Sequence, residues 1–204
     1  MRAQHLAKLT AILPALAAGS LLAQGTFIYD QQSSTDETPV PGGGGDMTQN
    51  TPIGQSFTPA LTSVAFVKLY FTYPPTPSIG ATVYVNLRSD SLTGPILGTT
   101  DPVKMLGDFV GVTNFLFTTP VPVTPGTTYF FEPVQSAGGP WNIISGPYLY
   151  PGGILYAQGT PVPGADLWFR EGIIPEPSWL CLVLVGGAVL VGAKLRTEGR
   201  RVRD

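Results

Sequence analysis

The sequence predicts an all-β fold for residues 26–173, an antiparallel β-sandwich of jelly-roll type. Apolar and polar residues alternate with period two, as in Thr82–Arg88, where Val83, Val85 and Leu87 share one face. Glycine and proline separate these runs at spacings typical of short antiparallel strands. No window between the two ends of the chain keeps a helical period over about ten residues. A barrel and an irregular β-structure are the alternatives.

Residues 1–25 have the pattern of a secretory signal peptide. Arg2 and Lys8 make the first segment positive, Leu9–Leu22 is mostly apolar, and small residues follow up to Gly25. The apolar run is short and is followed by a small-x-small cleavage pattern, which favours a signal peptide over an anchor. A buried helix that opens a cytosolic domain is the alternative.

Ten runs between the two ends have the length and composition of strands, and each is expected to turn one face to the core and the other to water. In Val64–Tyr73, for example, Ala65, Val67 and Leu69 share one face with Phe71 and Tyr73, opposite Lys68 and Thr72. The runs are Thr26–Asp30, Gly54–Phe57, Val64–Tyr73, Thr82–Arg88, Ile96–Thr99, Asn114–Thr118, Thr128–Val134, Trp141–Ser145, Ile154–Gln158 and Asp166–Arg170.

Two connections have local signatures. Val121–Tyr129 reads as a strand end, a turn at Pro125 and Gly126, and a returning aromatic strand, because proline presets φ and glycine accepts positive φ. Gln31–Thr51 contains serine, threonine, proline and four consecutive glycines without periodicity. This segment is expected to be a long mobile loop.

The C-terminal segment, residues 174–204, has three parts in a fixed order. Pro175, Glu176 and Pro177 precede an uncharged apolar run, Trp179–Ala193. A helix over that run would span about 22 Å, against a hydrocarbon core of about 30 Å, which predicts a short transmembrane helix. The basic residues after it would keep the C-terminus cytoplasmic and leave everything upstream outside. They are Lys194, Arg196, Arg200, Arg201 and Arg203.

Behind a signal peptide, this order resembles the PEP-CTERM sorting signal of Gram-negative bacteria. The resemblance covers only residues 174–204 and departs from the family in one respect, because the basic residues are spread out with Glu198 and Gly199 among them. It implies a membrane-embedded, exosortase-like enzyme as partner and delivery to the cell surface or its exopolysaccharide. An ordinary tail anchor is the alternative. Cys181, within the apolar run, is expected to be a small hydrophobic residue rather than a lipidation site.

Composition excludes several classes of function for the segment between the two ends. It carries four basic side chains against ten acidic ones, so nucleic acid is not an expected partner. The single histidine, His5, and the single cysteine, Cys181, both lie outside it. Ser-His-Asp and Cys-His catalysis and histidine-ligated zinc are therefore excluded. We predict that the protein is not an enzyme; a secreted hydrolase that uses two carboxylates is the least favoured alternative.

Two further kinds of site remain as hypotheses. Trp141 and Trp168 could contact a glycan, since Leu167 and Phe169 on one face would turn Trp168 outward; core packing is the alternative for both rings. Asp30 and Asp166 could share a calcium ion if the first and last strands pair. No other cofactor is expected.

Together these patterns predict an exported, non-enzymatic protein. It would be anchored in the inner membrane as a precursor, processed near the Pro-Glu-Pro motif, and then found at the cell surface or in the extracellular matrix. A carbohydrate-binding β-sandwich module of the exopolysaccharide is the second interpretation.

Overall fold

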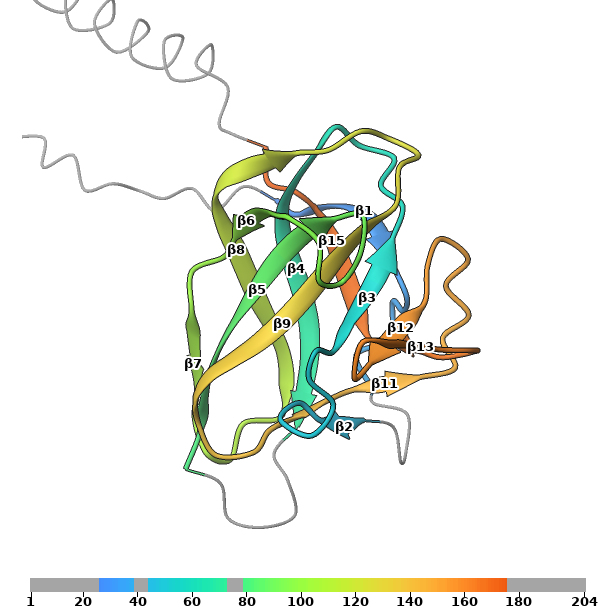
Figure 1. Cartoon of the computed structure of the whole chain (residues 1–204). Helices are drawn as coiled ribbons and strands as arrows, with labels where there is room; N and C mark the ends of the chain where they lie inside the picture. Colours follow the sequence, from blue (N-terminus) through green and yellow to red (C-terminus); the bar gives the residue numbers. More distant parts are fainter. Residues whose placement is uncertain (1–25, 39–43, 73–78, 176–204) are drawn as a thin grey trace, which may run out of the picture.

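The computed structural model describes residues 26–38, 44–72 and 79–175, and in these residues the protein is all-β, without a helix (Figure 1). The all-β class predicted from the alternation is confirmed for this part of the chain. The strands are β1 (Ile28–Gln32), β2 (Gly45–Asp46), β3 (Gly54–Phe57), β4 (Ser63–Thr72), β5 (Ala81–Ser89), β6 (Ile96–Thr99), β7 (Val103–Met105), β8 (Gly111–Pro122), β9 (Tyr129–Gly138), β10 (Asn142–Ile143), β11 (Ser145–Gly146), β12 (Leu155–Ala157), β13 (Thr160–Val162), β14 (Asp166–Leu167) and β15 (Phe169–Ile173).

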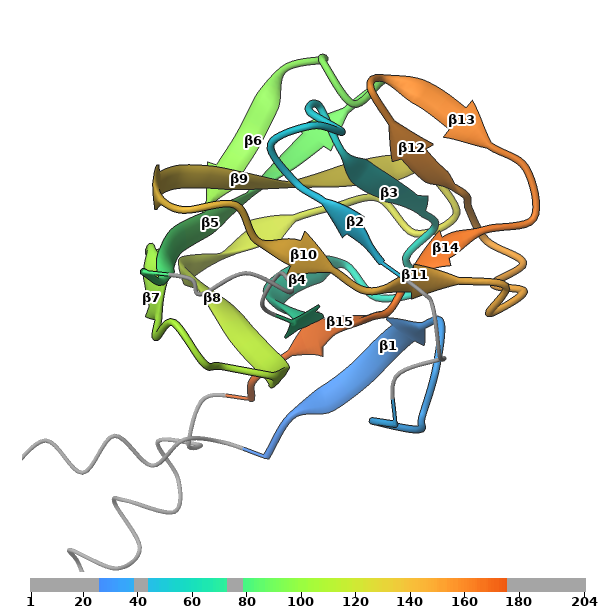
Figure 2. The ribbon, with the colours of Figure 1, turned by 90° about the horizontal axis from the view of Figure 1, so that it is seen from below.

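Two antiparallel sheets form most of the domain, an arrangement consistent with a β-sandwich (Figures 1 and 2). The first sheet has the order β1-β15-β4-β10-β2, and β8 also pairs with β4. The second has the order β13-β12-β3-β9-β5-β6, and β7 also pairs with β5. β11 and β14 form a separate short ladder.

The long strands pair from the outside of the sequence inward. β1 pairs with β15, β3 with β9, and β4 with β8, while β5 pairs with β6 and β7. This nested pattern is that of one long hairpin folded over into two sheets. As a result the two ends of the domain meet, with Ile28 directly opposite Ile173.

The main core consists of apolar side chains contributed by both sheets. On β5, Val83, Val85 and Leu87 are completely buried and alternate with Thr82 and Tyr84, as the sequence predicts. Burying an aliphatic or aromatic side chain of this size contributes about 1.5–3 kcal/mol to the hydrophobic driving force. Other fully buried members are Phe57, Val64, Val67, Leu69, Phe71, Phe115, Phe131, Trp141, Ile143, Leu167 and Phe169.

Strand β4 is buried on both faces, which corrects the expectation that one face lies in water. Residues 64–71 are all buried. On the outer face, the rings of Phe27 and Tyr29 lie 4.7 and 5.8 Å from Phe66, and Trp168 lies 5.8 Å from Tyr70. The period-two pattern is present as predicted, but covering groups from elsewhere in the chain remove the outer face from water.

Lys68 on β4 links this strand to residues of β1 and its start, across β15, which lies between the two strands. Its Nζ lies 3.8 Å from the centroid of the Phe27 ring and donates a hydrogen bond of 2.8 Å to the hydroxyl of Tyr29. The hydrogen bond from Lys68 lowers the pKa of Tyr29. A cation held over an aromatic face contributes about 0.5–2 kcal/mol, depending on its desolvation.

Residues 33–37 form what we call the N-terminal strap, which crosses the outer face of β15. The backbone N–H of Phe169 donates to Oγ of Ser33 at 2.9 Å, and Nε of Arg170 donates to the carbonyl of Ser34 at 2.9 Å. The indole Nε1 of Trp168 donates to the carbonyl of Asp36 at 2.6 Å. The prediction of a mobile loop was therefore wrong for this part of Gln31–Thr51.

Other sequence predictions agree with the structure to different extents. β3 and β6 have the predicted bounds, and the turn at Gly126 is present with a φ of +78°. The short strands β2, β7 and β13 were not predicted.

In the described residues, no helix meets the length and hydropathy needed to cross a membrane. The predicted signal peptide, 1–25, and transmembrane helix, 179–193, lie outside the described residues.

Candidate functional site

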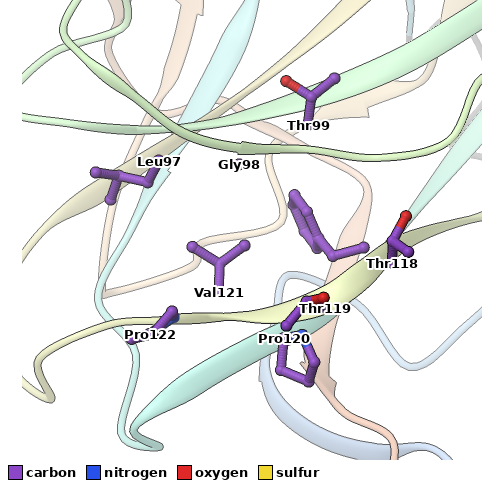
Figure 3. Close-up of a pocket in the computed structure, with 9 residues that line it drawn as sticks. Leu97, Gly98, Thr99, Thr118, Thr119, Pro120, Val121 and Pro122 are labelled. Carbon is purple, nitrogen blue, oxygen red and sulfur yellow. The ribbon is translucent and has the colours of Figure 1, made fainter.

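A surface hollow lies between β6 and the C-terminal half of β8, and we call it the edge groove (Figure 3). Its volume is about 360 Å³. None of its nine lining residues is charged, and the threonines among them supply hydroxyl groups. The lining residues are Leu97, Gly98, Thr99, Phe117, Thr118, Thr119, Pro120, Val121 and Pro122.

Glycine at position 98 keeps the edge groove open. A Cβ atom at Gly98 would lie 2.5 Å from Cγ2 of Val121 and 3.4 Å from the ring of Phe117. Figure 3 shows Val121 standing on β8 and pointing toward the strand that carries Gly98. Since Phe117 and Val121 belong to the core, the floor of the groove is apolar and well supported.

The hydroxyl groups around the groove differ in availability. Thr99 donates to Oδ1 of Asn86 at 2.8 Å, so its hydroxyl hydrogen is already used. Thr118 and Thr119 are exposed on β8. The groove thus presents an apolar floor and a neutral polar rim, a combination that suits an uncharged ligand.

A second hollow of about 460 Å³ adjoins β7 and the start of β8. Lys104 and Asp108 contribute opposite charges to its lining. Leu106, at its edge, is 68% exposed. This hollow shows no convergent set of polar groups that would define a ligand.

The two tryptophans proposed for glycan contact are both completely buried. Trp141 belongs to the main core, and Trp168 packs in a smaller cluster with Tyr70 and Ile144. Leu167 and Phe169 do face the main core, so the alternation predicted around Trp168 is right, but the N-terminal strap covers the opposite face. A ring without exposed surface cannot stack on a sugar, and the core-packing alternative holds for both residues.

The calcium hypothesis for Asp30 with Asp166 is also corrected. The first and last strands pair as required, but their ladder ends at Gln32 and Arg170, before Asp166 is reached. Asp166 is buried, and its carboxylate accepts hydrogen bonds of 2.9 Å from Nε2 of Gln55 and from the backbone N–H of Tyr150. Asp166 therefore links β3 to the segment before β12 rather than meeting Asp30.

Asp30 lies instead at a β-bulge, beside a group of polar side chains on the inner face of β1 and β15. The register shifts between Tyr29 and Gln31, which leaves Asp30 as the extra residue of the bulge. Its Oδ2 accepts hydrogen bonds from the backbone N–H groups of Ala60 and Leu61 at 2.7 and 2.9 Å. Its Oδ1 accepts a longer one of 3.2 Å from Nε2 of Gln31.

Tyr150, in the connection between β11 and β12, contacts this group through its side chain. Its ring meets Phe169 edge-on at 5.1 Å. Its hydroxyl donates to Oε1 of Gln31 at 3.1 Å and accepts from the backbone N–H of Thr58 at 3.3 Å. Burial raises the pKa of Tyr150 to about 12, so this hydroxyl remains protonated at physiological pH.

Glu171 is the most unusual residue of the group, which we call the inner acid site (Asp30, Gln31, Tyr150 and Glu171). It is completely buried, and neither carboxyl oxygen has a hydrogen-bond partner among the described residues. Burial raises the pKa of Glu171 to about 8, with a smaller contribution from the negative charge of Asp30. The nearby backbone N–H of Gln31 partly offsets this rise in pKa, although it forms no hydrogen bond with either carboxyl oxygen of Glu171.

The sequence contains a signal for Glu171 that the strand predictions did not include. Leu167 and Phe169 were expected on one face of the last strand, and Glu171 continues the same period-two series. An acid at a core position of a strand is rare unless it is paired or functional. The absence of a partner, however, depends on the fold and could not be read from the sequence.

Of the predicted sorting motif, only Pro175 lies in the described residues, where it is exposed two positions after the end of β15. Glu176, Pro177 and the basic residues from Lys194 to Arg203 lie outside them.

Comparison with known proteins gives no further guide to the site. No protein-family model matches the chain, and a search of the curated proteins also finds no match.

Proposed function

We propose that the chain is the precursor of an exported, non-enzymatic protein of the cell surface or extracellular matrix, sorted through Pro175, Glu176 and Pro177. The observation that carries this proposal is the pairing of Ile28 with Ile173. The two expected processing signals precede Ile28 and follow Ile173 in the sequence, so both adjoin the same corner of the folded domain. A domain arranged in this way can stay folded while each signal is cleaved near the membrane.

The fold supports a binding or structural role for the β-sandwich domain. We assign the sandwich to the jelly-roll type, because its four nested ladders match one long hairpin folded into two facing sheets. Residues 26–174 contain no cysteine, so the stability of this domain comes from packing and not from a disulfide. Among the described acids, Asp30 and Asp166 accept hydrogen bonds from neutral donors, and Glu132 pairs with Arg88 at 2.7 Å. These roles are structural.

Replacing Pro175, Glu176 and Pro177 together by alanine tests the sorting proposal. The variant is expected to accumulate as an unprocessed, membrane-bound precursor, since the processing enzyme would no longer find its recognition sequence. A Pro120→Ala, Pro122→Ala variant, which changes a similarly spaced pair on β8, is the matched control and should be processed normally. Cell fractionation with immunoblotting measures both outcomes. Normal processing of the triple-alanine variant would refute the sorting function.

A carbohydrate-binding role is the second candidate, and the edge groove is the observation that favours it. Its uncharged lining suits a neutral polysaccharide better than a charged one. Thr119→Arg would place a long charged side chain in the groove and is expected to weaken binding at least tenfold. Thr127→Arg, in the exposed turn between β8 and β9, is the control. Retention on immobilised neutral polysaccharides measures the effect, and no retention of the unaltered protein would remove this candidate.

A further inference from the structure

The inner acid site holds two carboxyl groups, Asp30 and Glu171, and neither forms an ion pair among the described residues. Glu171 on β15 lies directly across from Gln31 on β1, and side chains of such a cross-strand pair share one face of the sheet. Phe169, two residues before Glu171, faces the core, and Gln31 reaches Tyr150 on the same side. The bulge at Asp30 turns a second carboxylate toward this group, which Gln31 contacts through Nε2.

Glu171 is the observation that points to a ligand. Its side chain is 0% exposed, and both oxygens lack a hydrogen-bond partner in the described residues. Buried polar groups in folded proteins are nearly always hydrogen-bonded. A buried carboxyl group without a protein partner therefore indicates a bound water or ion. A bound cation would satisfy both oxygens at once and would also neutralise Asp30.

We propose that Asp30 and Glu171 bind one calcium ion at the bulge between β1 and β15, with Gln31 Oε1 and the Tyr150 hydroxyl as neighbouring neutral oxygens. Two carboxylates balance the charge of a divalent cation. The candidate ligands are all oxygens, which favours a hard cation over zinc or copper. Calcium accepts six to eight oxygens in irregular geometry, whereas magnesium requires a near-ideal octahedron and keeps several waters. A buried, irregular site therefore suits calcium.

The proposed site differs from a cluster of several acids. The described residues contain no group of three or more histidine, cysteine, aspartate or glutamate side chains placed to hold a metal. Neutral oxygens must therefore complete the coordination. Because the site joins the first strand to the last, calcium binding would strengthen the closure of the sandwich at the corner from which both processing signals leave.

Thermal unfolding of the full chain in a non-ionic detergent, with calcium chloride or with a chelator, tests this proposal. At about 100 times its Kd, calcium is expected to raise the Tm by about 5–10 °C. Glu171→Gln should fold, because it removes a buried acid without changing its size, and should abolish the increase in Tm. Glu132→Gln is the matched control, since its pairing with Arg88 lies on the other sheet, and it should keep the increase.

A second readout does not depend on stability. Terbium binds at calcium sites, and the ring of Tyr150 beside the site is expected to sensitise its emission on excitation of tyrosine. Emission that calcium displaces, and that Glu171→Gln loses, would support the site. Absence of a calcium-dependent increase in Tm in the unaltered chain, or an equal increase in Glu171→Gln, would overturn the proposal. An equal increase with magnesium chloride would overturn the assignment to calcium.

Discussion

Replacing Trp168 by alanine is expected to lower the free energy of unfolding by about 3–5 kcal/mol, the range for truncating a buried aromatic side chain. The indole is fully buried, packs against Tyr70 at 5.8 Å and lies under the guanidinium of Arg170 at 4.8 Å. Its Nε1 also holds the N-terminal strap through the carbonyl of Asp36. Truncation would therefore leave a cavity and release the strap.

Two control variants separate these contributions. Trp168→Phe keeps most of the ring volume but loses the hydrogen bond, and is expected to cost about 1–2 kcal/mol. Ile79→Ala removes an apolar side chain that is 85% exposed, and should change stability by less than about 0.5 kcal/mol. Urea unfolding followed by circular dichroism measures all three. A loss below about 1 kcal/mol for Trp168→Ala would contradict the buried position of this ring.

The metal-free protein is expected to lose stability as the pH rises from about 4.5 to about 8. Folding raises the pKa of Glu171 from its ordinary value of 4.5 to about 8, chiefly through burial. A carboxyl group with a raised folded-state pKa gives its full contribution below the unfolded pKa, and loses it as the pH rises through the folded one. Raising a pKa by one on folding corresponds to about 1.4 kcal/mol, so the total loss for Glu171 is several kcal/mol.

The Glu171→Gln variant isolates this effect from the other titrating groups. Glutamine is neutral at every pH, so the difference in unfolding free energy between variant and unaltered protein should grow from pH 4.5 to 8 and then level off. Urea titrations at several pH values, with a chelator present, give this difference. A constant difference across that range would show that Glu171 does not titrate as a buried acid.

The strands themselves were largely predictable because their signal is local. β3 and β6 have the predicted bounds, since each is a short run between clear turn residues. β2, β7 and β13 were missed because strands of two or three residues are too short to show a period. Their existence depends on pairing with residues far away in the sequence.

The positions of the candidate site residues were less predictable. Alternation placed Leu167 and Phe169 correctly, but nothing near Trp168 in the sequence indicates that residues 33–37 would cover it. Pairing of the first and last strands was the condition set for a site at Asp30, and the structure meets that condition. The register of that ladder then brought Glu171, rather than Asp166, opposite the bulge. Which segment covers a residue, and the register between strands far apart in the sequence, depend on the whole fold. Local sequence patterns therefore could not predict them.

The intact mass of the mature protein, recovered from the cell surface or the culture medium, tests the export and processing scheme most directly. We expect a single species that begins close to residue 24 or 26 and ends within or beside Pro175, Glu176 and Pro177. Both ends of the chain are fixed by that one measurement. Recovery of the unprocessed polypeptide of all 204 residues from the cytosol, with no shortened form outside the cell, would contradict the scheme.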